Sequence, residues 1–306
     1  MDELTLLKEA APEVAPPTTE ALRAGRARLA AAARPRRSRR PLALGAAVAA
    51  AAVAITVVPY ADPGPTPAAS AAAVLRDAAA TAAAEPDVRP GQFRYVKSLT
   101  QRRHPRLGPS GIVCAESWYP ADGAPVTLPV HIAPNSVPGG CGSALPKPAE
   151  RSMLVYEGPP AHPRAHDLPT APAALRARLY REAAKGPRAW GEDPGTPADQ
   201  LVFVFAERLL EESAPSALRA ALYRVLAEVP GVRLVRNVRD LAGRPGDAVT
   251  RTWGAERQEI ILDRATHRYL GGRQVFVKPR GDWRPGDQSA VAQIRTAIVG
   301  KAYQRP

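Results

Sequence analysis

Apolar residues repeat along this chain at two spacings, and each spacing predicts a different kind of element. Segments 172–184, 198–212 and 215–229 place apolar residues three and four positions apart, on one face of a helix. The clearest stripe consists of Val202, Phe205, Ala206 and Leu209. A fourth segment, 71–84, is rich in alanine, a strong helix former. We therefore expect four helices beyond residue 70.

Alternation of apolar and polar residues predicts strands on both sides of the last three helices. Two expected strands, 92–100 and 112–118, precede these helices. Six more follow, over residues 231–238, 248–253, 259–263, 267–271, 274–278 and 290–301, with turns through residues 243–246 and 264–266. Strands, then helices, then consecutive antiparallel strands indicate the α+β fold class.

One segment departs from both patterns, because residues 42–58 are apolar except for Thr56 and carry no charge. Five arginines stand just before it: Arg34, Arg36, Arg37, Arg39 and Arg40. An apolar run with basic residues on one flank is typical of a transmembrane helix whose basic flank stays in the cytoplasm. We expect a cytoplasmic head (1–41), a transmembrane helix (42–58), a Pro-rich linker (59–70) and an outer domain (71–306).

A cleaved signal peptide is the alternative interpretation of the same segment. Residues 38–42, SRRPL, resemble a twin-arginine export signal, and Ala69-Ser70-Ala71 is a candidate cleavage site. The apolar run is longer than the usual signal-peptide core of about 7–15 residues. We therefore favour an uncleaved anchor, which predicts a single-pass protein of the cell membrane with its C-terminal domain outside.

The charge distribution makes nucleic acid an unexpected partner. The chain carries +13, of which the head, with nine basic and five acidic residues, supplies +4. The densest basic cluster lies beside the predicted span, where topology and anionic lipid explain it. The remaining positive charge is spread along the outer part and suits anionic envelope polymers or a solvated surface.

The head itself has a helical pattern that a bare anchor does not need, with apolar residues at Leu4, Leu7, Leu22 and Leu29. About forty residues cannot bury a core of their own. These leucines are therefore candidates for contact with a cytoplasmic partner.

The two cysteines, Cys114 and Cys141, both lie beyond the predicted span. Outside the cytoplasm such thiols oxidise and persist as a disulfide, and closing a loop of about 28 residues contributes about 3 kcal/mol. We expect this disulfide, with two unrelated free thiols as the alternative.

Residues that carry chemistry are few. His162 and His166 are four apart but lie among prolines, which predicts a loop and no metal site. The acidic pairs Glu211–Glu212 and Glu256/Glu259 are interpreted as solvated. We find no nucleophile with a matching base and no phosphate-binding loop, so we expect no enzymatic activity and no cofactor. For the four tryptophans we favour core packing, and the alternative is that one or two of them line a groove.

Several stretches resemble an actinobacterial family of single-pass membrane proteins. They are MDELTLLKE at residues 1–9, ALRAGRARLAAA at 21–32, ESWYPADG at 116–123, LRAALYRVLAEVPGV at 218–232, VRDLAGRPGDAV at 238–249 and LDRATHRYLGG at 262–272. The Leu-Asp-x-x-Thr hairpin of the last stretch also resembles LolA-like and RseB-like envelope proteins. That resemblance implies a curved antiparallel sheet, a half-barrel, wrapped over helices.

The order of head, span and outer domain is similar to that of membrane-bound anti-sigma factors, although this head lacks their His-x-x-x-Cys-x-x-Cys zinc signature. The resemblance implies that the outer domain senses an envelope component while the head regulates a cytoplasmic partner such as a sigma factor. The alternative is a membrane-tethered carrier or chaperone for a lipid or lipoprotein, without signalling.

Overall fold

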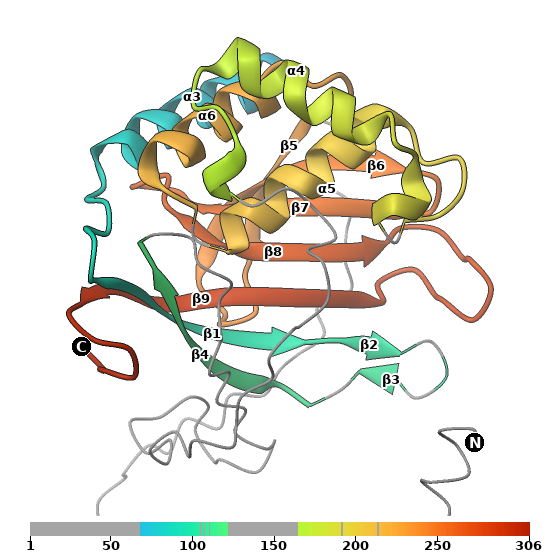
Figure 1. Ribbon diagram of the computed structural model, residues 1–306. Helices are drawn as coiled ribbons and strands as arrows, with labels where there is room; N and C mark the ends of the chain where they lie inside the picture. The colour runs from blue at the N-terminus through green and yellow to red at the C-terminus, as the bar shows by residue number, and fades with distance from the viewer. Residues whose placement is uncertain are drawn as a thin grey trace, which may run out of the picture. The chain divides into compact units, whose positions relative to one another are not determined.

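The computed structural model describes residues 68–104, 106, 108–109, 111–121, 165–190, 192–212 and 214–306 (Figure 1). All of them belong to one compact unit, Val58–Pro306. The predicted head, its four leucines, the five arginines and the predicted span lie outside the described residues. Within the part that is described, no helix has the length and apolar character needed to cross a membrane.

The four expected helices are confirmed, with small differences at their ends. They are α3 (Ala68–Ala84), α4 (Pro172–Ala183), α5 (Ala198–Glu211) and α6 (Ser216–Leu226), and the short 3-10 helices are η1 (Ala165–Asp167) and η2 (Pro187–Trp190). Helix α6 begins one residue later than predicted, and Pro215 precedes it. The Asp87 carboxylate accepts hydrogen bonds from the Ser216 amide and hydroxyl at 2.7 Å, which satisfies a helix end that has no cap of its own.

A seven-stranded, fully antiparallel sheet forms the second layer, in the order β4-β1-β9-β8-β7-β6-β5. Its strands are β1 (Phe93–Gln101), β4 (Val113–Pro120), β5 (Arg233–Arg239), β6 (Pro245–Trp253), β7 (Glu256–Asp263), β8 (Tyr269–Phe276) and β9 (Gln288–Val299). A small hairpin of β2 (Arg103–His104) and β3 (Gly108–Pro109), which the sequence did not predict, extends from β1. The fold is α+β, with a large antiparallel sheet packed against helices, as expected.

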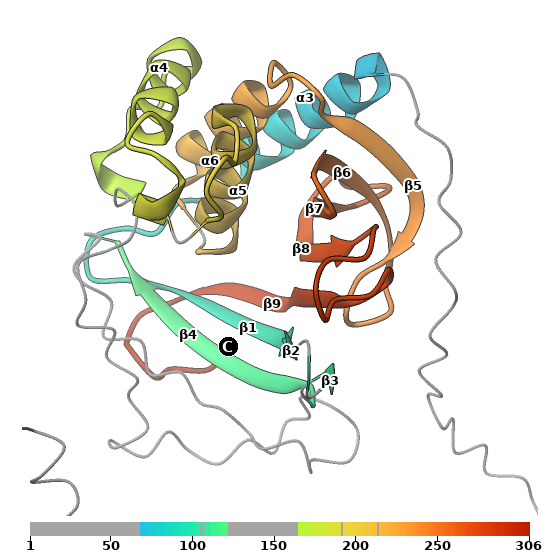
Figure 2. The ribbon, with the colours of Figure 1, turned by 90° about the vertical axis from the view of Figure 1, so that its right-hand side faces the viewer.

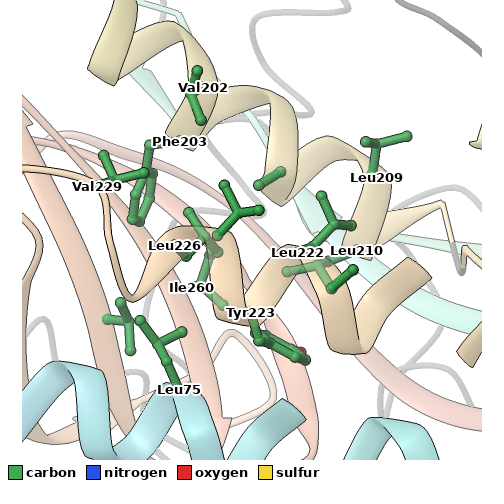
Figure 3. Close-up of a cluster of buried hydrophobic side chains, with 14 of the residues drawn as sticks. Leu75, Val202, Phe203, Leu209, Leu210, Leu222, Tyr223, Leu226, Val229 and Ile260 are labelled. Atoms are coloured by element: carbon green, nitrogen blue, oxygen red, sulfur yellow. The ribbon is translucent and has the colours of Figure 1, made fainter. Parts of the chain in front are cut away.

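The helices cover one face of one half of the sheet. Helix α5 contacts β6, β7 and β8, and α3 contacts β5, while α3, α4 and α5 all pack on α6. Figure 2 shows the helices above and to the left of β6–β8, with β9, β1 and β4 below them. The core between the layers joins Leu75, Phe203, Leu222 and Ile260, which come from three helices and β7 (Figure 3).

The end of the β5–β6 hairpin reaches over the opposite face of the sheet. Arg244, in its turn, donates hydrogen bonds to the carbonyls of Leu270 in β8 and Gln293 in β9, at 3.1 and 2.7 Å. A second small core lies on that face and includes Val238, Ala248 and Ile261. The sheet is therefore strongly curved, and the bend of β5 is visible in Figure 2.

Two predicted strands, 267–271 and 274–278, are in fact one strand, β8, so the break predicted after Gly271, at Gly272 and Arg273, was wrong. Both glycines mark close approaches inside the strand. A Cβ on Gly271 would lie 2.0 Å from the Val291 carbonyl oxygen of β9, and one on Gly272 would lie 2.1 Å from Glu207 Oε1 of α5. The predicted turn at 243–246 also ends early, because β6 already begins at Pro245, a position that strands tolerate for proline.

Candidate functional site

A shallow, open depression of about 340 Å³ lies where three connections meet: the loop between η2 and α5, the β6–β7 turn and the β8–β9 loop. Its lining residues are Asp193, Pro194, Trp253, Gly254, Ala255 and Arg280. Trp253 ends β6, and Gly254 follows it with φ of +60°, a backbone conformation that favours glycine. This tight turn holds the indole at the rim instead of in the core.

Arg280 organises the charges of the depression. Its guanidinium donates to Asp193 on one side and to Glu256 on the other. The hydrogen bond with Asp193 raises the pKa of Arg280 above its ordinary value, so the group stays cationic. Glu256 also accepts from Gln274 Nε2 at 2.6 Å, which fixes the carboxylate against β8. The expectation that Glu256 is simply solvated was therefore wrong.

Contacts within the loop that carries Arg280 hold its conformation. Arg280 and Trp283 exchange backbone hydrogen bonds of 3.2 and 3.0 Å, and Trp283 stacks on Phe276 with centroids 4.2 Å apart and planes 8° apart. An indole, two carboxylates and a guanidinium on fixed elements can hold the apolar face and the hydroxyl groups of one ligand. This arrangement of one aromatic and several charged groups suits the binding of a polar ligand.

A second group of polar residues is buried between α5 and the sheet. Glu207, 6% exposed, receives a hydrogen bond from Gln258 Nε2 of β7 and lies over the space left by Gly272. Burial raises the pKa of Glu207 to about 8, and nearby Glu211 adds to the effect. Burial also raises the pKa of Glu211, which the sequence had assigned to a solvated face. Glu207 is buried deep in the fold, so its protonation mainly affects the stability of the domain.

A third group contradicts the prediction that Glu259 is solvated, because this residue is fully buried. Its carboxylate accepts from Arg257 Nε at 2.8 Å and from Arg273 Nε and Nη2 at 2.8 and 2.5 Å. The strand alternates, so Glu259 points away from the helices while Ile260 points toward them. The ion pairs stabilise the buried charge on that second face.

The C-terminal segment covers the outer face of β1 and β4. Trp118 donates to the Gln304 carbonyl at 2.7 Å, and its ring lies 5.7 Å from that of Tyr303. Buried Glu116 accepts from the Tyr95 hydroxyl at 2.6 Å and from Arg305 at 2.6 Å. Trp118 is thus a core residue, as predicted, whereas Trp253 lines the depression.

Only some of the candidate site residues that the sequence predicted are among the residues that the structure describes. Cys114 is disulfide-bonded, whereas Cys141 lies outside the described residues, so their pairing stays a prediction. His166 is in η1, and His162 is not described. Within the described ranges, no three His, Cys, Asp or Glu side chains gather as metal ligands would. The signal for the depression was the Trp253-Gly254 pair at a hairpin turn.

No family model matches this chain, and a comparison with curated proteins finds no match either.

Proposed function

We propose that the protein is a single-pass membrane protein whose described α+β domain lies outside the cytoplasm and binds an envelope component. Residues 1–41 would form the cytoplasmic head and regulate a partner such as a sigma factor. The basic cluster before the apolar run supports this topology, and the leucine pattern of the head supports a partner. Within this proposal the protein is a sensor and not an enzyme.

The observation that carries the proposal is the disulfide-bonded state of Cys114 on β4. Disulfides persist in oxidising compartments and are rare in the cytosol. The described domain begins only ten residues after the apolar run ends at Val58. A disulfide at Cys114, beyond the predicted span, supports an outer location for the described domain.

The proposed binding site is the depression around Trp253 and Arg280. Its indole and charged groups favour a hydroxyl-rich ligand such as an envelope glycan. The curved sheet with helices on one face also supports the likeness to LolA-like and RseB-like envelope proteins, including their half-barrel form. A lipid or lipoprotein carrier would need an apolar groove. Among the described residues, Tyr303 is the one large apolar side chain that is exposed, at 42%, so we prefer the sensor.

Protease protection on intact cells, with a tag at each end of the full chain, tests the topology. We expect the C-terminal tag to be cleaved from outside and the N-terminal tag to be protected. A shorter released form beginning near Ala71 would refute the anchored sensor. Removing residues 1–33 while keeping the five arginines and the span then separates the two functions. Lost regulation with ligand binding retained supports the sensor, and an unchanged phenotype supports the carrier.

Calorimetric titration of the full chain with a soluble N-acetylglucosamine trisaccharide tests the site. We expect Trp253→Ala to weaken binding about two- to tenfold, which corresponds to the loss of one aromatic stacking contact. Trp253→Phe, which keeps an aromatic face, should retain most of the affinity. If both variants bound the trisaccharide as tightly as the wild type, the binding site would have to lie elsewhere. That result would leave the proposed topology unaffected.

A further inference from the structure

Arg219 lies in the first turns of α6, and only part of its guanidinium group makes hydrogen bonds with the described residues. Its side chain is only 11% exposed, and Nη1 donates to Glu85 Oε2 at 2.7 Å. Nε and Nη2 are buried and have no hydrogen-bond partner among the described residues. Two buried donors without partners cost several kcal/mol, which calls for a physical reason.

Nε and Nη2 form the side edge of a guanidinium group, whose two parallel N–H groups match one oxyanion. Three other arginines of this domain use that edge for a carboxylate. The pairs are Arg273 with Glu259, Arg305 with Glu116 and Arg244 with Asp240. On Arg219 the same edge is desolvated, but no carboxylate of the described residues lies against it.

A second guanidinium group lies beside the first. Arg94 of β1 is 8% exposed, and its pKa is lowered by burial and by the positive charge of Arg219. Its Nη2 reaches the Pro86 carbonyl at 3.2 Å and stays 3.9 Å from Asp87. An anion between the two arginines would relieve their repulsion.

The carboxylates nearby are already committed. Asp87 accepts from the Ser216 amide and hydroxyl, both at 2.7 Å. Glu85 is shared between Arg219 and Arg268, the latter at 3.6 Å. Three cations, Arg94, Arg219 and Arg268, thus face two carboxylates, and one positive charge is left over. The excess positive charge and the unpaired Nε–Nη2 edge of Arg219 both favour an anionic ligand with oxygen acceptors.

We propose that the Nε–Nη2 edge of Arg219, with Arg94 beside it, is a binding site for an oxyanion, either a phosphate or a carboxylate group. Both donors are covered in this structure, so the anion reaches them as the covering atoms move aside. The site is separate from the depression around Trp253, and the inference does not depend on the proposed function.

Thermal unfolding of the full chain at constant ionic strength tests the site. Inorganic phosphate, glycerol 1-phosphate and acetate replace chloride in separate titrations. We expect a saturating rise in the unfolding midpoint of about 5–10 °C at a hundredfold excess over Kd with at least one oxyanion. Glycerol 1-phosphate acting better than inorganic phosphate assigns the site to a lipid headgroup, and acetate acting alone assigns it to a carboxylate.

Arg219→Lys keeps the charge beside Glu85 but removes the paired donors, so we expect the response to disappear while the unfolding midpoint in chloride changes little. Arg224→Lys, on the exposed face of the same helix, is the matched control and should respond like the wild type. The proposal is overturned if no oxyanion raises the midpoint above the chloride value, or if Arg219→Lys responds as strongly as the wild type.

Discussion

Replacing Glu207 by Gln should make the domain much more stable at alkaline pH and leave it unchanged at acid pH. Glu207 is buried beneath α5, and burial raises its pKa from 4.5 to about 8. The folded state therefore holds this proton more tightly than the unfolded state. Unfolding releases the proton between these two pKa values, so the free energy of unfolding falls as the pH rises through that range.

The magnitude follows from the two pKa values. Their difference corresponds to at most about 5 kcal/mol, lost between about pH 4.5 and pH 8. Glutamine is neutral at every pH, and its carbonyl oxygen can still accept the hydrogen bond from Gln258. We therefore expect E207Q and the wild type to agree within about 1 kcal/mol near pH 5. Near pH 9 the variant should be more stable by about 3–5 kcal/mol, and its unfolding midpoint higher by roughly 10 °C.

Urea unfolding of the full chain, followed by tryptophan fluorescence between about pH 5 and pH 9, measures this difference. The other charged groups that act on Glu207 are Glu211, Arg208 and Glu192, and all three remain in the variant. Glu228→Gln is the matched control, because Glu228 is largely exposed and pairs with Arg176 at 3.7 Å. It should follow the wild type at every pH. Parallel curves for E207Q and the wild type would refute the reasoning, since they would mean that Glu207 titrates normally.

Three further predictions concern stability. Gly272→Ala should cost about 1–3 kcal/mol in urea unfolding, because its Cβ would lie 2.1 Å from Glu207 Oε1. Most of this cost should vanish in a double variant with Glu207→Ala, and an additive result would contradict the close contact. Arg305→Ala should cost about 2–4 kcal/mol by leaving Glu116 buried without its cation, and adding Glu116→Gln should recover part of the loss. Reduction of the Cys114 disulfide should lower stability by about 3 kcal/mol, which the unfolding midpoint with and without dithiothreitol measures.

The periodicity of the sequence predicted the helices and most strands, but not how completely α5 is buried. The stripe of Val202, Phe205 and Leu209 predicted one buried face, whereas Phe203 and Val204 on other faces are buried as well. The continuous apolar run over residues 201–206 was the available signal, since a helix that is apolar all round lies inside. Helix α6 and the sheet bury α5 from two sides, and the sequence of the α5 segment alone does not predict either neighbour.

The buried charges were harder to predict because their partners are distant in the chain. Glu259 stands next to the run Ile260-Ile261-Leu262, and three consecutive apolar residues imply that both faces of β7 are covered. That run should have argued against a solvated Glu259. Its cation, Arg273, comes from the neighbouring strand, and only the β7–β8 register brings the two together. The depression could not be predicted for the same reason, since the three connections that form it are far apart in the sequence.

The arginine excess of the outer part takes on a structural meaning once these pairs are placed. From the sequence alone, the surplus of +9 beyond the head was consistent either with contact to anionic envelope polymers or with a solvated surface. In the described domain, buried carboxylates such as Glu259 and Glu116 are each matched by the side edge of an arginine. Other guanidinium donors use backbone carbonyls, as Arg244 Nη2 does with Leu270 and Gln293. Arg219 departs from this pattern, because its Nε and Nη2 are buried without a partner among the described residues, and the proposed oxyanion would supply the missing acceptor.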